Sequence, residues 1–137
     1  MPESAVADRK RLALRFDPVR LQADLARLDA SAWTEHFVRQ NYDGQWSVLP
    51  LRAPEGAAHP IQMILSHPGV EAYVDTPFLA EAPYLQEVLA SFACPLESVR
   101  LMRLAAGSVI KEHADPDLDV EAGTVRLHVP VVTNPDV

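Results

Sequence analysis

Proline is the feature that most limits how this chain can fold. The chain has 12 prolines, and most of them fall after residue 49, at positions 50, 54, 60, 68, 77, 83, 95, 116, 130 and 135. Proline lacks an amide hydrogen and its ring clashes with the preceding helical turn, so it ends or kinks a helix. The sequence therefore argues against a long helical bundle and predicts short elements joined by many turns.

Two helices are predicted. Asp17 suits an N-cap and Pro18 the first helical position, and leucines follow at helical spacing. We expect this helix over about 18–29, with Leu21, Leu25 and Leu28 on one face and Arg20, Asp24 and Arg27 on the other. Pro83 begins a second helix, over about 84–93, and Pro95 ends it. Its apolar stripe is Leu85, Val88, Leu89 and Phe92.

Alternating side chains predict strands at 12–16 and 124–133, and further strands are predicted at 45–51 and, from its branched side chains, at 98–106. In the strand at 124–133, one face carries Val125, Leu127, Val129 and Val131, and the other carries Arg126, His128, Pro130 and Val132. The order of elements predicts an α+β domain, mainly β, in which helices back a sheet. We expect helix 84–93 to pack on the outer face of that sheet, against Val125, Leu127 and Val129.

Composition narrows the class of protein. A chain of 137 residues favours one domain, with a helical and irregular part at 1–95 and core strands at 96–137. The net charge of −7 argues against a nucleic-acid partner. The single cysteine, Cys94, excludes an internal disulfide and a multi-cysteine zinc site. No apolar run is long enough to span a membrane and no signal peptide is evident, so we expect a cytoplasmic protein without a membrane partner.

His113 and Asp115 form the first candidate site. In extended backbone, alternate residues point to the same side, so an imidazole and a carboxylate placed in this way can bind one metal ion. Two such ligands and a second histidine make the facial triad of non-haem iron oxygenases. The alternative is that both side chains are simply solvated in a hydrophilic loop, and the spacing alone favours that alternative.

Arg126 and His128 form the second candidate site, on one face of the predicted strand 124–133. The planar fork of an arginine suits a carboxylate, and a neighbouring imidazole adds a donor. The alternative is that Arg126 pairs with a carboxylate of the preceding acidic loop, and His128 is then a sheet residue. The carboxylates of that loop are Asp117, Asp119 and Glu121.

Together these residues carry a resemblance. The stretch VRLMRLAAGSVIKEHADPDLDVEAGTVRLHVPVVTN, residues 99–134, resembles the aspartyl/asparaginyl β-hydroxylase family of iron(II)- and 2-oxoglutarate-dependent oxygenases. The matching positions are Gly107, His113, Asp115, Arg126, His128 and Pro130. Weaker similarity extends back to about residue 42 and includes Trp46 and the Pro-Tyr-Leu at 83–85.

The resemblance implies a double-stranded β-helix, a jelly-roll or cupin-like fold, with iron(II) held by His113 and Asp115. It implies that Arg126 and His128 bind the cosubstrate 2-oxoglutarate. The reaction would hydroxylate an amino acid, or an Asp, Asn or Pro residue of a peptide, and release succinate and CO2.

The chain departs from the family after Asp115. The family's later iron-binding histidine, and the arginine after it, have no counterpart before Val137. We therefore expect an incomplete β-helix in which catalysis by this chain alone is uncertain, and open sheet edges that could pair with a second copy. The alternative function is a non-catalytic, cupin-like domain that binds a small acid or mediates an interaction.

Overall fold

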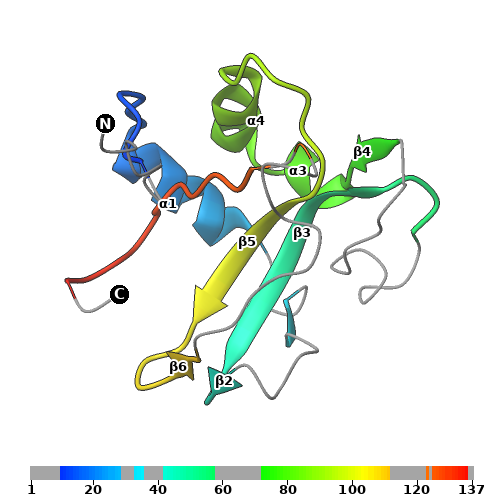
Figure 1. The fold of residues 1–137 in the computed structure, drawn as a ribbon. Helices are drawn as coiled ribbons and strands as arrows, with labels where there is room; N and C mark the ends of the chain where they lie inside the picture. The colour runs from blue at the N-terminus through cyan, green and yellow to red at the C-terminus, as the bar shows by residue number, and fades with distance from the viewer. Residues whose placement is uncertain are drawn as a thin grey trace, which may run out of the picture.

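The structure, a computed structural model, describes residues 10–28, 33–35, 42–57, 72–111, 123 and 125–135. They form an α+β fold with two open antiparallel sheets and three helices (Figure 1). The described strands form neither a closed barrel nor a jelly roll, and none of the described helices is long and apolar enough to cross a membrane. The elements are α1 (Pro18–Arg27), β1 (Thr34–Glu35), β2 (Tyr42–Asp43), β3 (Trp46–Pro54), β4 (Tyr73–Asp75), α3 (Pro77–Ala80), α4 (Pro83–Ala90), β5 (Val99–Leu104) and β6 (Val109–Ile110).

Strand β3 is the centre of the larger sheet. Val48 pairs with Thr34 of β1 and with Met102 of β5. Because a strand residue has one partner on each side, β5 occupies one edge of β3 and the short strands β1 and β4 share the other. The smaller sheet pairs β2 with β6. Strands at 45–51 and 98–106 were predicted from the sequence, and β3 and β5 confirm both.

The pairing of β3 with β5 shifts register between Pro50 and Arg52. A bulge is one of the few places where an internal strand tolerates proline. Thr76 satisfies the carbonyl groups at this irregularity: its hydroxyl donates to the Pro50 oxygen at 2.8 Å and its amide donates to the Leu51 oxygen at 2.9 Å. The side chain is buried, so neither carbonyl depends on water.

Replacing Thr76 with valine is expected to lower the free energy of unfolding by about 1–3 kcal/mol. Valine keeps the shape of threonine but leaves the buried Pro50 carbonyl without its hydroxyl donor. Urea denaturation measures the change, with Thr133→Val as the matched control at an exposed threonine. Equal losses in the two variants would show that the Thr76 hydroxyl does not stabilise the bulge.

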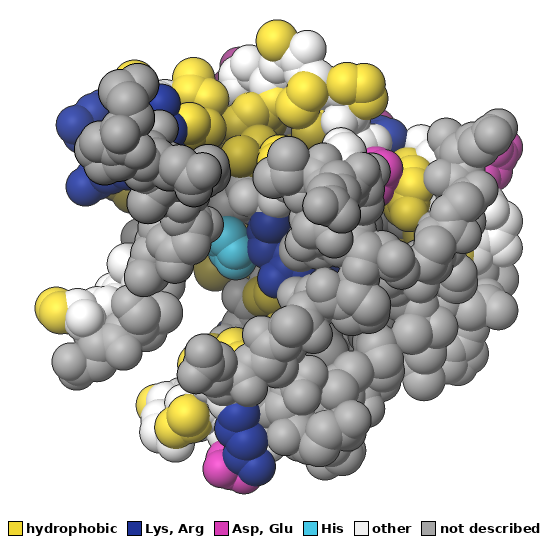
Figure 2. Space-filling view, viewed as in Figure 1, with side chains coloured by type: hydrophobic (Ala, Val, Ile, Leu, Met, Phe, Trp, Pro, Cys, Tyr) yellow, Lys and Arg dark blue, Asp and Glu magenta, His cyan; other side chains and the backbone are white. Residues whose placement is uncertain are grey.

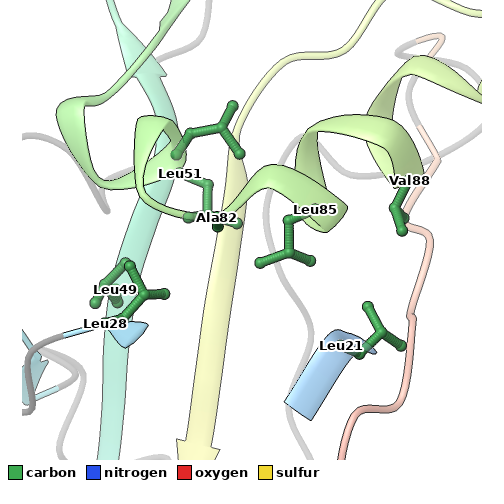
Figure 3. Close-up of a cluster of buried hydrophobic side chains, with 8 residues drawn as sticks. Leu21, Leu28, Leu49, Leu51, Ala82, Leu85 and Val88 are labelled. Atoms are coloured by element: carbon green, nitrogen blue, oxygen red, sulfur yellow. The ribbon is translucent and has the colours of Figure 1, made fainter. Parts of the chain in front are cut away.

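The hydrophobic core lies between β3 and the helices (Figure 3). Helix α1 begins as predicted, because Asp17 Oδ1 accepts the Val19 amide at 2.9 Å and Pro18 is the first helical residue. Helix α4 is also confirmed at Pro83–Ala90, with its predicted stripe facing the core. The buried members of the cluster are Leu21, Leu28, Leu49, Leu51, Leu79, Ala82, Leu85 and Val88.

The expectation that Asp24 lies on the polar face of α1 is wrong. Asp24 is 1% exposed and accepts the Leu85 amide of α4 at 2.7 Å through Oδ2. Its other oxygen accepts Arg27 Nη1 at 3.1 Å. The residue before α4, Ala82, has no side-chain oxygen, so the carboxylate of α1 takes the place of a cap on this helix.

A second set of contacts holds α1 against α4. The Asp17 amide donates to the Tyr84 hydroxyl at 2.7 Å, and the Arg20 guanidinium lies 4.1 Å from the centre of the Tyr84 ring. Arg20 also pairs with Glu87 at 2.9 Å. This ion pair is exposed and contributes little, so the buried Asp24 contact is the stronger polar link between the helices.

Two sequence predictions about the sheet are wrong. Residues 12–16 form no strand, and Leu12 and Leu14 are about half exposed, although Phe16 packs edge-on against Phe92 at 6.1 Å. Helix α4 does not pack on Val125 and Leu127, which are 74% and 42% exposed. Its partners are α1 and α3, and its buried residues share a core with β3, because the described residues after Gly123 do not join the sheet.

Strand β3 is buried on both of its faces. Leu49 belongs to the helix-side core, while Val48, which points to the opposite face, is also 0% exposed. On that opposite face Trp46 packs edge-on against Tyr42 at 5.6 Å. A strand buried on both faces is typical of the inner layer of a domain rather than of a sheet with one face in water.

Candidate functional site

The chain reaches the His113–Asp115 segment through β5, a tight turn and β6. The Ser108 amide donates to the Ala105 oxygen at 3.0 Å, and Gly107 adopts a φ of 76°, which closes the turn. After it, Val109 and Ile110 pair with Asp43 and Tyr42 of β2. Lys111 is the last described residue before the candidate metal ligands, and its Nζ lies 3.6 Å from Asp43 Oδ1. The approach to the segment is therefore anchored in the smaller sheet.

The turn before β6 is locked to the turn between β2 and β3. The Gln45 amide donates to the Ser108 hydroxyl at 2.8 Å, and the Ala105 amide donates to the Gln45 oxygen at 3.0 Å. Gly44 has a φ of 98°, and a Cβ atom at this position would lie 2.2 Å from Ser108 Oγ. Only glycine fits here without displacing Ser108, since both the backbone conformation and the close contact exclude a side chain.

The hydrogen bonds between these two turns were not predicted from the sequence. Asp43-Gly44 is a turn dipeptide, and it was a signal for the turn between β2 and β3. The contact with Ser108 is long-range and could not be read from local pattern. A second long-range contact joins Arg103 of β5 to Trp33: the guanidinium carbon of Arg103 lies 4.6 Å from the centre of the Trp33 ring.

Arg126 and His128 are both exposed, but the predicted strand that was to carry them is not formed. Residues 125–133 are irregular, without the ladder of a strand. Val129 and Val131 pack against the core, and Gln22 Nε2 of α1 donates to the Val131 oxygen at 3.2 Å. Of the four side chains predicted to face inward, Val129 and Val131 do so, whereas Val125 and Leu127 are exposed, and the segment lies on the core without a paired strand.

The designated metal ligands, His113 and Asp115, lie outside the described residues, as do His36, His59 and His67. Among the residues that the structure describes, no group of three His, Cys, Asp or Glu side chains is placed to hold a metal ion. The expected metal centre thus depends on residues 112–122.

The described charges on one face are mostly basic near its middle. Figure 2 shows histidine and Lys or Arg side chains at the centre of this view, with the visible carboxylates toward its edges. Arg126 and His128 supply donors that suit an anion, whereas the chain as a whole has a net charge of −7.

The pKa of Tyr73 is shifted by its surroundings. Burial raises the pKa of the Tyr73 hydroxyl above its usual 10.0; the nearby Glu97 adds to the rise and Arg100 opposes it. The hydroxyl therefore stays neutral at physiological pH.

Comparisons with protein-family models, with curated proteins and with solved structures find no match. The assignment of a function to this chain consequently rests on its own residues.

Proposed function

We propose that this chain is part of an iron(II)- and 2-oxoglutarate-dependent oxygenase that hydroxylates an amino acid or an Asp, Asn or Pro residue in the cytoplasm. The corresponding fold is a double-stranded β-helix backed by α1 and α4. The observation that carries the proposal is the order of residues around the β5–β6 turn. A strand and a glycine turn lead directly into His113-x-Asp115, and an Arg-x-His pair follows at 126–128.

Two features of the fold support the proposal. The strand before the candidate ligands is fixed by β2 and by the contact of Gly44 with Ser108, so the segment begins from a rigid base. Strand β3 is buried on both faces, as an inner strand of a β-helix would be. Helices α1 and α4 cover one of these faces.

The residues proposed to hold iron suit it chemically. An imidazole and a carboxylate are two of the three ligands of the facial triad, and His113 and Asp115 follow directly after β6 in the sequence. Bound iron would supply the oxidative chemistry that couples decarboxylation of 2-oxoglutarate to hydroxylation. The proposed role of His113 and Asp115 is to hold the ion while leaving coordination positions of the metal open for the cosubstrate.

Arg126 and His128 are the proposed anchors of 2-oxoglutarate. Both are exposed on the segment that Val129 and Val131 pin to the core, so their side chains reach solvent while the backbone beneath them is held. The guanidinium would bind a carboxylate through two parallel hydrogen bonds, and the imidazole would donate one more.

An Arg126→Lys variant is expected to bind 2-oxoglutarate about tenfold more weakly than the parent chain in the presence of Mn(II). Lysine keeps the charge but loses the two-pronged geometry, and tenfold corresponds to roughly one charge-assisted hydrogen bond. Isothermal titration measures the affinity, with Arg11→Lys as the control at another exposed arginine. If Arg126→Lys binds as the parent does, Arg126 is not an anchor of the cosubstrate.

The same titration separates the proposal from its alternative, a non-catalytic domain that binds a small acid. The oxygenase requires 2-oxoglutarate to bind more tightly when metal is present, because cosubstrate and metal share one site. A binding domain would take 2-oxoglutarate and simple dicarboxylates such as succinate with equal affinity, whether or not metal is added.

A further inference from the structure

Residues 10–16 have the alternating pattern of a strand, but they pair with no strand among the described residues. From residue 11 onward, cationic or small side chains alternate with larger apolar ones, in the order Lys10, Arg11, Leu12, Ala13, Leu14, Arg15 and Phe16. The segment is the dark-blue trace that leads into α1 in Figure 1. Within the described part of the chain no backbone hydrogen bond reaches residues 10–16, so the amides and carbonyls of this segment are left to water.

One end of this segment is fixed to the helices. The Phe16 ring packs edge-on against Phe92, with 6.1 Å between the ring centres. The next amide, that of Asp17, donates to the Tyr84 hydroxyl at 2.7 Å. The two leucines of the segment are about half exposed. The segment is therefore held at its end, while the backbone and the leucines before that end are open to solvent.

The cations of this segment have no partner of opposite charge among the described residues. Lys10, Arg11 and Arg15 are exposed and form no ion pair in that part of the chain. Arg20 and Arg27 of the adjoining α1, in contrast, each pair with a carboxylate. Figure 2 shows Lys or Arg side chains gathered at the corner of the molecule where α1 begins. Three unmatched positive charges thus lie close together in a chain whose net charge is −7.

These features define the partner that would cover the segment. A strand placed alongside supplies hydrogen-bond partners for the open backbone, and its side chains lie opposite those of the segment at about 4.5–5.5 Å between Cβ atoms. Carboxylates opposite Arg11 and Arg15 would pair with them, and apolar side chains on the other face would cover Leu12 and Leu14. The charge and the alternation together favour an acidic strand with alternating apolar residues.

Two other occupants fit less well. A second copy of the same segment would bring three cations from each chain to one interface, and like charges on neighbouring strands destabilise their pairing. An anionic membrane would attract the cations, but an extended segment that enters lipid leaves its backbone groups without hydrogen bonds.

We propose that residues 10–16 are a docking strand for an extended, acidic segment of another protein, in which Asp or Glu alternates with apolar residues. The carboxylates of the partner bind Arg11 and Arg15, its apolar side chains contact Leu12 and Leu14, and its backbone pairs with that of the segment. This surface is separate from the proposed oxygenase site, because it uses none of the residues assigned to that site.

Three N-acetylated and C-amidated peptides of about seven residues, in which Asp, Asn or Lys alternates with Val, test the chemistry of the partner. Each peptide is titrated into the whole chain and followed by amide chemical shifts. The Asp peptide should shift the amides of residues 11–16. The Asn peptide keeps the shape and the backbone but lacks the carboxylates, so it should bind about tenfold more weakly, and the Lys peptide should not bind. Equal binding by the Asp and Asn peptides, or no shifts with the Asp peptide at about 10 mM, would overturn the proposal.

Variants of the segment test its location and its strand pairing. Arg11→Gln/Arg15→Gln should weaken binding of the Asp peptide about tenfold, whereas Arg103→Gln, at an exposed arginine of β5, should leave it unchanged. Ala13→Pro keeps every charge but removes an exposed amide, so it should also weaken binding if the backbone pairs with the peptide. Full binding by the double variant or by Ala13→Pro would contradict the docking strand, as would binding of the chain to phosphatidylserine vesicles in place of the Asp peptide.

Discussion

An Asp24→Ala variant is expected to lose about 2–4 kcal/mol in free energy of unfolding. Alanine removes the acceptor of the Leu85 amide, which lies in the first turn of α4 and is buried. It also leaves Arg27 without its partner at 3.1 Å and opens a small void beside Leu21 and Leu28. Because α4 has no cap of its own, its N-terminus loses its only side-chain acceptor among the described residues.

Chemical denaturation of three variants separates the loss of the acceptor for the Leu85 amide from the loss of a carboxylate between the two helices. Asp24→Asn keeps an oxygen for the Leu85 amide and should lose less than Asp24→Ala. Glu87→Ala removes an exposed carboxylate between the same two helices and should cost less than about 1 kcal/mol. A loss in Asp24→Ala no larger than in Glu87→Ala would show that the buried carboxylate does not join α1 to α4.

A Gly44→Ala variant is expected to lose about 2–4 kcal/mol, for two reasons that add. The φ of 98° is strained for alanine, and the new Cβ would lie 2.2 Å from Ser108 Oγ and 2.9 Å from Ser108 Cα. The Ser108 backbone must therefore move, which breaks the bond from the Gln45 amide and disturbs the pairing of β2 with β6.

Gly56→Ala is the matched control for this variant. Gly56 has a similar φ of 84°, but no atom lies within 4 Å of a Cβ added there. It therefore reports the cost of backbone strain alone, about 1–2 kcal/mol. Equal losses at the two glycines, measured by urea denaturation, would contradict the close contact between Gly44 and Ser108.

Elements with a local signal could be predicted from the sequence. Helix α1 has a cap, a proline and a leucine repeat within one short stretch, and α4 lies between two prolines. Strands β3 and β5 are rich in apolar and branched side chains. In each case the residues that define the element are neighbours in the chain, so their pattern was sufficient.

Features that depend on a distant partner could not be predicted. Residues 12–16 and 124–133 alternate like strands, but alternation determines only which way side chains face and not whether another strand lies alongside. Asp24 was assigned to the polar face from its charge, although its position between Leu21 and Leu28 at helical spacing placed it on the buried face. Its partner, the Leu85 amide, lies on another helix.

In the candidate site too, some features were predicted from the sequence and others depend on a distant partner. The motif around His113 and the Arg-x-His pair were predicted from the family resemblance of residues 99–134, and both stay predictions. The close contact of Gly44 with Ser108 and the hydrogen bond from the Gln45 amide to the Ser108 hydroxyl join two turns that are far apart in the sequence. They hold the strand that leads into the motif. No local pattern could connect them.

The proposed oxygenase function depends most on His113 and Asp115 binding iron together. Anaerobic isothermal titration of Fe(II) into the chain should show one metal ion bound per chain. His113→Ala and Asp115→Ala should each lower the affinity for Fe(II) by more than the roughly 10- to 100-fold caused by replacing a residue that hydrogen-bonds to a metal ligand. His67→Ala should leave the affinity unchanged. Equal affinity for iron in His113→Ala, in Asp115→Ala and in the parent chain would contradict the proposed metal site.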